Sequence, residues 1–257
     1  MKFKAVIFDL DGTLLNTIED LKNATNYALT AFGYPARTTE EMKHFAGRGV
    51  RYMVAQALPG GEANPQFEEV FDCFRPYYEA HCQDLTAPYP GIGELLSRLR
   101  LAGCKTAVVT NKLQSAADEL IHDLFPDIPL VVGDSPAVRR KPAPDGVWPA
   151  LEKLGVDRAD AAYVGDSNID FETAKNAALP CLSVLWGFRT REEPVASGPH
   201  TFFETPEELA DYLLPCPGNP PIKINRPAAR LKSCRRFFFC GQLRLTDMPQ
   251  AMSIIHL

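Results

Sequence analysis

A chain of 257 residues can form one large domain or one domain with an insert. Its 46% hydrophobic and 23% charged residues are typical of a globular protein, and no apolar run approaches the roughly 20 residues of a membrane-spanning helix. The start of the chain does not resemble a signal peptide, and seven cysteines without a Cys-x-x-Cys pair indicate reduced thiols. The net charge of −5 argues against general nucleic-acid binding. We therefore expect a cytoplasmic protein with neither nucleic acid nor a membrane as its partner.

Residues 16–84 read as a series of helices without an intervening strand. Apolar residues at helical spacing predict a helix over 17–32, which residues 17–20 would begin as a capping box. Further helices are expected at 39–45, at 50–58 and from residue 65, with Asn64 as N-cap, to 82. Pro76 should kink or divide the last of these helices. The profile is that of an inserted helical domain.

From residue 88 onward, helix-length segments alternate with short β-rich runs. The expected strands are 105–109, 130–132, 161–164, 181–185 and 201–203. The expected helices are 91–102, 115–124, one that ends at 154, 169–178 and 206–214. Pro149 should weaken the helix that ends at 154. Strands separated by helices imply crossover connections and a parallel sheet.

The fold class that follows is α/β, with a doubly wound, Rossmann-like parallel sheet and an inserted helical domain. The apolar residues 5–8 supply the first, fully buried strand. We expect residues 1–15 and 85–215 to form the α/β core and residues 16–84 to form the insert. Residues 216–257 would be an atypical basic and apolar tail, separate from both.

Polar residues stand where several of the expected strands end. Asp9 and Asp11 follow the first strand at positions i and i+2, so their side chains can converge on one point. The other polar residues at strand ends or on neighbouring loops are Thr110, Asn111, Lys141, Asp166 and Asp170. Open α/β sheets bind ligands at the carboxyl ends of their strands. These residues are therefore the candidates for a site.

The motifs that these residues form resemble those of the haloacid dehalogenase-like superfamily, in its phosphatase branch with a small helical cap. The matching stretches are Asp9-Leu-Asp11-Gly-Thr-Leu14, Val108-Val-Thr110-Asn111, Arg140-Lys141-Pro142 and Gly165-Asp166-Ser-Asn-Ile-Asp170. Shorter stretches, among them Gly47-Arg48-Gly49 and Thr110-Asn111-Lys112, are similar to those of phosphoglycolate phosphatases. The resemblance covers about residues 3–214.

The resemblance and the chemistry together imply a phosphoric monoester hydrolase. A carboxylate nucleophile divides phosphate-ester hydrolysis into two easier steps, and Asp9 is placed to serve as that nucleophile. Asp11 would protonate the leaving alkoxide and then act as base for the attacking water. Thr110, Asn111 and Lys141 would hold the nonbridging phosphate oxygens, with Lys141 counted among the catalytic residues.

Clustered carboxylates also require a cation between them. We expect Mg²⁺ as the cofactor, because a hard divalent ion with oxygen ligands would bridge Asp9, Asp166 and the phosphate. The resemblance implies that Asp11 contributes its main-chain carbonyl to this ion. Asp170 lies one helical turn beyond Asp166 and has two equal interpretations, as a contact of the metal's water shell or as a helix cap.

The substrate is expected to be a small phosphorylated metabolite, with 2-phosphoglycolate as the best candidate. Its carboxylate needs a cation or main-chain amides in the cap, and Gly47, Arg48, Gly49 and Arg51 are the best candidates. The alternative for both arginines is a solvated surface position. Alternative substrates are a phosphosugar, a nucleotide or pyrophosphate, because a fold does not determine its substrate.

Two other functions remain open. The chain could be a phosphotransferase resembling β-phosphoglucomutase, or a catalytically silent binding protein of the same fold. The protein could be a monomer or a homodimer.

For residues 216–257, with seven Lys/Arg and one Asp, we favour a disordered or accidental extension over a segment that docks to an acidic or membrane surface.

Overall fold

The computed structural model describes residues 1–189 and 201–214 of the 257-residue chain. The tail predicted for residues 216–257 lies outside the described residues. Among the helices of the described part, none combines the length and the apolar character that crossing a membrane requires.

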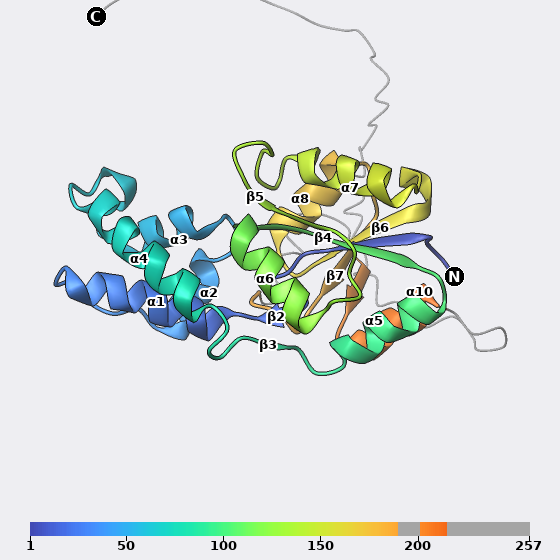
Figure 1. Cartoon of the computed structure of the whole chain (residues 1–257), viewed down its shortest axis with the longest axis horizontal. Coiled ribbons are helices and arrows are strands. Elements are labelled where there is room, and N and C mark those ends of the chain that lie inside the picture. Colours follow the sequence, from blue (N-terminus) through green and yellow to red (C-terminus); the bar gives the residue numbers. More distant parts are fainter. Residues whose placement is uncertain (190–200, 215–257) are drawn as a thin grey trace, which may run out of the picture. The chain divides into compact units, whose positions relative to one another are not determined.

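A six-stranded parallel sheet forms the centre of the α/β part of the chain (Figure 1). Its strands are β1 (Ala5–Phe8), β4 (Lys105–Leu113), β5 (Val131–Asp134), β6 (Ala161–Gly165), β7 (Cys181–Val184) and β8 (Thr201–Phe203). The spatial order is β5-β4-β1-β6-β7-β8. The chain therefore builds outward from β1 in one direction, through β4 and β5, and then in the other. This is the doubly wound sheet that the sequence predicts, and the fold class is confirmed.

Helices cover both faces of this sheet. One face is covered by α5 (Ile92–Leu101), α6 (Gln114–Leu124) and α10 (Pro206–Leu213), and the other by α7 (Val147–Leu154) and α8 (Asn168–Asn176) (Figure 1). Strand β1 shows why both faces are apolar: Val6 and Phe8 pack with the first group of helices, while Ala5 and Ile7 pack with the second. A strand buried on both faces reads as a continuous apolar run.

A helical segment lies between two short strands that pair with each other. Strands β2 (Leu15–Asn16) and β3 (Ala87–Pro88) are antiparallel and bring its two ends together. Between them lie α1 (Ile18–Ala31), α2 (Thr39–Phe45), α3 (Val50–Ala57) and α4 (Phe67–His81). These helices share a hydrophobic cluster of their own, distinct from the two clusters on the sheet. We call residues 18–81 the helical insert.

The capping box predicted at residues 17–20 is wrong. Thr17 is the N-cap of α1, but its hydroxyl makes no capping hydrogen bond and is buried without a partner within the described part of the chain. The carboxylate of Asp20 instead accepts hydrogen bonds from the main-chain N–H groups of Leu85 and Thr86, at 3.0 and 2.8 Å. Asp20 therefore ties the start of the insert to the segment that leaves it.

Two prolines affect their helices less than predicted. Helix α4 continues through Pro76 without division, because its opposite face, with Phe74 and Tyr78, is buried in the insert's cluster. Pro76 and Asp72, whose carbonyl loses its partner, are both exposed, so water can serve that carbonyl. Pro149 lies in the first turn of α7, where a main-chain N–H has no partner within the helix in any case.

Candidate active site

The order of the strands brings the predicted site residues to one edge of the sheet. Strand β1 lies between β4 and β6. Asp9 follows β1 directly, and Asp166 follows β6 directly. Thr110 and Asn111 lie within β4, which is longer than predicted, at a point where its register with β5 shifts between Val109 and Leu113. Such a shift re-aims side chains that a regular strand would point into the core.

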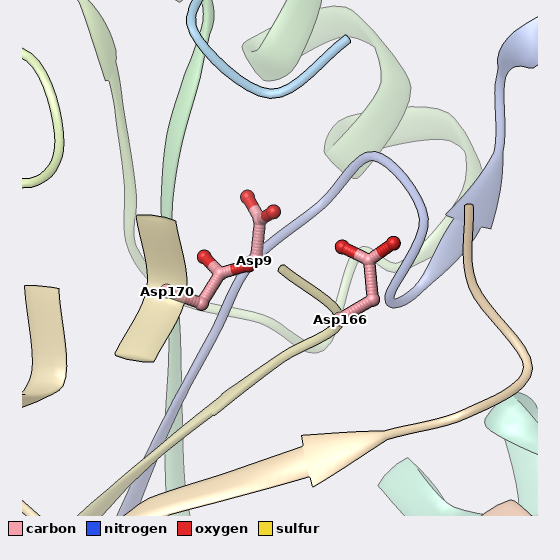
Figure 2. A group of neighbouring side chains, drawn as sticks. All are labelled: Asp9, Asp166 and Asp170. Atoms are coloured by element: carbon pink, nitrogen blue, oxygen red, sulfur yellow. The ribbon is translucent and has the colours of Figure 1, made fainter. Parts of the chain in front are cut away.

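Three buried carboxylates form a cluster at this edge (Figure 2). Asp9, Asp166 and Asp170 each offer an oxygen atom, and these atoms lie within 4.8 Å of one another. They come from the ends of β1 and β6 and from α8. The backbone also fits closely around Asp166: a Cβ atom on Gly12 would lie 2.6 Å from its Oδ2, and one on Gly187 would lie 2.5 Å from it.

The cluster is electrostatically unfavourable even with the ammonium of Lys141 beside it. Burial raises the pKa of Asp9 to about 8, and the charge of Asp170 adds to the effect. Burial likewise raises the pKa of Asp166 to about 7, again with a contribution from Asp170. These carboxylates are hard to ionise at the same time because their negative charges repel one another. Their oxygens suit a hard divalent ion, whose positive charge would remove that repulsion. The residues present therefore fit the metal that the sequence predicts.

Lys141 is the buried cation beside this cluster. Its Nζ lies 2.7 Å from Oδ1 of Asp9 and 2.7 Å from Oδ1 of Asp170, and it donates to the hydroxyl of Tyr163 at 3.1 Å. Burial opposes the charged ammonium, but Asp170 and Asp9 outweigh it and hold the pKa of Lys141 well above its ordinary value. The contact with Asp9 is an ion pair without hydrogen-bond geometry, so Oδ1 of Asp9 has no hydrogen-bond donor among the described residues.

Both oxygens of Asp170 are engaged by the chain itself. Oδ1 faces Lys141, and Oδ2 accepts from the main-chain N–H of Ser167 at 3.0 Å and from its hydroxyl at 2.6 Å. Ser167 and Asp170 form a capping box at the start of α8. Of the two interpretations of Asp170, the helix cap is therefore present in the structure, and the contact with a metal's water shell stays a prediction.

Asn111 joins the loop of Lys141 to the helical insert. Its Oδ1 accepts from the main-chain N–H of Lys141 at 2.8 Å, and its Nδ2 donates to the carbonyls of Lys141 and Gly47 at 3.1 and 3.0 Å. The side-chain amide is thus fully used. Thr110 lies beside it, and its Oγ1 accepts from the main-chain N–H of Lys112 at 3.2 Å, which leaves the hydroxyl proton for another acceptor.

Asp11 has a partner that the sequence analysis did not single out. Nζ of Lys112 lies 3.0 Å from Oδ1 of Asp11 and also donates to the hydroxyl of Tyr78 on α4. The Lys112 side chain is 1% exposed and that of Asp11 is 19% exposed. Burial opposes the charge of Lys112, but Asp11 and then Tyr78 more than offset it and raise its pKa.

These residues share a cavity between the sheet edge and the helical insert. From the sheet side it is lined by Asp9, Asp11, Thr110, Asn111 and Lys112. From the insert it is lined by Leu21, Ala46, Gly47, Gly49, Val50, Met53 and Tyr78. Gly49 (φ +88°) takes a conformation that L-residues rarely adopt, and its added Cβ would lie 3.3 Å from the Asn111 carbonyl. The insert's backbone therefore approaches the sheet edge closely here.

Arg48 and Arg51 of the insert do not line this cavity. Arg51 pairs with Glu68, and with Glu62 at 3.6 Å, and its guanidinium lies over the ring of Phe67. Arg48 lies over the ring of Tyr52, with 5.5 Å between the guanidinium carbon and the ring centroid. Their predicted part in substrate specificity stays a prediction, whereas Gly47 and Gly49 lie where the prediction needs them.

A family comparison agrees with this geometry. The family model described as haloacid dehalogenase-like hydrolase matches residues 6–184, which is more than half of the chain. The chain belongs to the haloacid dehalogenase-like hydrolases.

Named relatives narrow the class of this hydrolase. N-acetylmuramic acid 6-phosphate phosphatase of Pseudomonas aeruginosa is 32% identical over 216 residues, which are 83% of this chain and 96% of that protein. A phosphoglycolate phosphatase of Agrobacterium fabrum is 36% identical over 194 residues, 71% of this chain and 80% of the relative. The prediction of an enzyme, a phosphoric monoester hydrolase similar to phosphoglycolate phosphatases, is confirmed.

Solved structures have the same fold. A Lactobacillus delbrueckii subsp. bulgaricus protein, provisionally named a phosphoglycolate phosphatase, matches with a TM-score of 0.80 and 37% identity over 84% of this chain and all of that one. A haloacid dehalogenase-like family hydrolase from Streptococcus pneumoniae matches with a TM-score of 0.74 and 25% identity, over 82% and 98% of the two chains.

In this haloacid dehalogenase-like hydrolase, sequence reasoning missed a loop that contacts three parts of the site. Trp186 donates to the carbonyl of Thr13 at 2.9 Å, Phe188 donates its N–H to Oδ2 of Asp166 at 2.7 Å, and Arg189 donates to the carbonyl of Ala46 at 2.6 Å. Phe188 also packs in the insert's hydrophobic cluster. The loop follows the predicted strand at 181–185, but nothing in its own composition signalled these contacts.

Proposed function

We propose that this protein is a Mg²⁺-dependent phosphatase of small phosphate monoesters, which acts through a phosphorylated Asp9. The observation that carries the proposal is the cavity lined by both Asp9 and Asp11, with the carboxylate cluster and Lys141 beside it. The family and the named relatives support it.

In the first step, a carboxylate oxygen of Asp9 attacks the phosphorus atom and the bond to the leaving oxygen breaks. Asp11 gives its carboxyl proton to that oxygen, so an alcohol departs and an acyl phosphate remains on Asp9. In the second step, a water oxygen attacks the phosphorus while Asp11, now a carboxylate, takes the water's proton. The bond to Asp9 breaks, which releases inorganic phosphate and restores both side chains.

Asp9, Asp166 and the main-chain carbonyl of Asp11 would hold the Mg²⁺ ion. When bound, the ion supplies charge stabilisation for the carboxylates and the phosphoryl group. Asp170 acts beside it as a positioning residue, because its oxygens are already bound to Lys141 and Ser167.

Three groups of the chain bind the phosphoryl oxygens. Lys141 contributes its ammonium, which the ion pair with Asp170 keeps in place beside Asp9. Thr110 contributes its hydroxyl proton, since its oxygen already accepts from Lys112. For Asn111 the main-chain N–H is the proposed donor, because both protons of its side-chain amide serve carbonyl groups.

Residues 16–84 serve as the cap of this site and residues 1–15 with 85–215 as its core. The contacts of Asn111 with Gly47 and of Arg189 with Ala46 support this division, since both bring the loop before α3 against the core. A cap that closes over bound substrate excludes water during the first step.

The proposed substrate is 2-phosphoglycolate, the compound that several relatives' names give. A panel with Mg²⁺ tests it: 2-phosphoglycolate, N-acetylmuramic acid 6-phosphate, a hexose phosphate, a nucleoside monophosphate, pyrophosphate and p-nitrophenyl phosphate. We expect the highest kcat/KM for 2-phosphoglycolate. Highest activity on another compound would replace the substrate and keep the phosphatase, whereas transfer of phosphate between sugar hydroxyls would favour the mutase. No turnover of any compound would refute the enzymatic proposal.

A further inference from the structure

Lys112 is a buried cation whose position is not explained by phosphate binding. It follows the phosphate-binding pair Thr110 and Asn111 on β4, but its Nζ lies next to Asp11 and Tyr78. Among the described residues that line the cavity, Lys112 is the one with a positive charge. The insert's wall opposite contains Leu21, Val50 and Met53, so this charge faces a mostly apolar wall.

The hydrogen-bond donors at this point are not all used. A lysine ammonium has three N–H groups, and within residues 1–189 and 201–214 two acceptors are present for Lys112, namely Oδ1 of Asp11 and the hydroxyl of Tyr78. The Tyr78 oxygen accepts from Lys112, and its own proton has no acceptor in the same residues. One N–H and one O–H are therefore left at a buried place where an unmade hydrogen bond is costly.

The two free donors differ in kind from those around the phosphoryl group. A carboxylate offers two oxygens and a negative charge, and so matches one charged and one neutral donor side by side. A neutral hydroxyl would satisfy one of them and would leave the charge of Lys112 without an anion while Asp11 carries the proton that it gives to the leaving oxygen. The chemistry therefore favours an anionic, two-oxygen group at this place.

Asp11 sets where on the substrate that group must be. In the proposed function Asp11 protonates the leaving oxygen, and this inference rests on that role. Lys112 is 3.0 Å from Asp11, so a group that Lys112 binds is joined to the leaving oxygen through very few atoms. We propose that Lys112 and Tyr78 form the subsite for the carboxylate of the leaving group, and that the substrates are phosphate esters of 2-hydroxy acids.

The subsite explains how the insert takes part in recognition without Arg48 and Arg51. Tyr78 comes from α4 of the insert and Lys112 from β4 of the core, so a bound carboxylate joins the two parts. Arg48 and Arg51, the cations that the sequence favours, lie over aromatic rings of the insert instead. Lys112 therefore takes the role expected of Arg48.

The first test compares two substrates that differ only at this group, 2-phosphoglycolate and 2-hydroxyethyl phosphate. We expect Lys112→Met to reduce the ratio of their kcat/KM values by about 10- to 100-fold, the value of a hydrogen bond to a charged group, mostly through KM. Tyr78→Phe, which keeps the ring's shape, should reduce it by about 3- to 10-fold. Lys153→Met, an exposed lysine on α7, is the control and should leave the ratio unchanged.

The second test measures binding without turnover. Glycolate, the alcohol product, should raise the melting temperature of the wild-type protein with Mg²⁺, and Lys112→Met should abolish that rise. Ethylene glycol at the same concentration is the control ligand and should have a smaller effect in both proteins. This test remains informative if the protein hydrolyses no ester, because it measures binding of the carboxylate group and not turnover.

Each outcome decides between the two proposals. Equal losses on both substrates in Lys112→Met and Tyr78→Phe would show that Lys112 only orients Asp11, and would overturn the subsite. A wild-type enzyme that hydrolyses p-nitrophenyl phosphate but does not prefer 2-phosphoglycolate would also overturn it, while the phosphatase proposal would stand. A ratio that falls in Arg48→Ala but not in Lys112→Met would assign the carboxylate to Arg48. Stabilisation by glycolate without any turnover would refute the phosphatase proposal alone.

Discussion

Nζ of Lys141 lies 2.7 Å from Oδ1 of Asp170, and both side chains are buried. The same carboxylate caps α8 through Ser167. A helix start and the site's cation are thus fixed by one side chain, which explains how a lysine on a loop rich in proline can be held in place. The pair lies beside Asp9, so the position of Lys141 also determines the surroundings of the nucleophile.

Asp170→Asn should therefore lower the free energy of unfolding by about 3 kcal/mol, because the buried ammonium of Lys141 then loses one of its two carboxylate partners and keeps Asp9 as the other. Urea denaturation of the metal-free protein measures this. The double variant with Lys141→Met should recover part of the loss, since both charges are then removed. Asp145→Asn, whose carboxylate pairs with Arg139 near the surface, is the control and should change stability little. Additive effects of the two buried substitutions would contradict the pairing.

Asp9→Asn should reduce kcat by about 10⁴-fold or more, because an amide cannot form the acyl phosphate. Mass spectrometry after rapid acid quench should detect one phosphoryl group on the wild-type protein and none on the variant. Asp157→Asn, at an exposed position just after the end of α7, serves as the control. Retention of the phosphoryl group in Asp9→Asn would place the nucleophile elsewhere.

The carboxylate cluster should make the metal-free protein less stable as the pH rises. The pKa of Asp9 is raised from 3.8 to about 8, and that of Asp166 from 3.8 to about 7. Between about pH 4 and pH 8 the folded state therefore binds more protons than the unfolded state. Stability must then fall with increasing pH from about 4 to about 8. Melting temperatures in EDTA measure it, and Asp9→Asn should show a shallower decline.

Mg²⁺ should reverse this trend, because a bound cation favours the ionised carboxylates. The rise in melting temperature on adding Mg²⁺ should be larger at about pH 8 than at about pH 6, where binding must displace protons. A rise that does not depend on pH would mean that the ion binds outside the cluster.

Asp20 should matter for the insert while Thr17 should not. Asp20→Ala removes a buried carboxylate that accepts from the main-chain N–H groups of Leu85 and Thr86, and the loss of these hydrogen bonds to a charged group should cost about 1–3 kcal/mol. Thr17→Val removes a buried hydroxyl that has no partner among the described residues, so it should be neutral or slightly stabilising. Chemical denaturation of both variants compares them. A larger loss of stability in Thr17→Val than in Asp20→Ala would support the capping box predicted at residues 17–20.

Gly187→Ala tests how tightly the loop that contains Trp186, Phe188 and Arg189 fits against the carboxylate cluster. Its new Cβ would lie 2.3 Å from the carbonyl oxygen of Gly12 and 2.4 Å from Cβ of Asp166. The loop or Asp166 must move, and we expect Mg²⁺ affinity to fall by about 10- to 100-fold, as for changes around other metal ligands. Gly93→Ala in α5, where a Cβ meets no atom within 4 Å, should instead stabilise the protein by about 0.5–1 kcal/mol. Isothermal titration with Mg²⁺ and thermal denaturation measure the two effects.

Local patterns in the sequence predicted most elements because their causes are local. Helix α2, Thr39–Phe45, and strand β8, Thr201–Phe203, have the expected bounds. The predictions that failed depended on neighbours distant in sequence. Thr17 lost its capping role because Asp20 meets Leu85 and Thr86, which lie 65 and 66 residues further along the chain. Pro76 did not divide α4 because buried aromatic side chains hold that helix together.

The sequence by itself determined the doubly wound fold, the family and the strand-end residues Asp9, Asp11, Thr110, Asn111 and Asp166, because periodicity and motif spacing are properties of the chain alone. The tertiary structure decided which cations meet which carboxylates. Lys141 joins Asp9 and Asp170, Lys112 joins Asp11 and Tyr78, and Arg51 turns away to Glu68. A long, flexible cationic side chain pairs with whatever acceptor the folded chain brings within reach, and spacing along the sequence does not encode that acceptor.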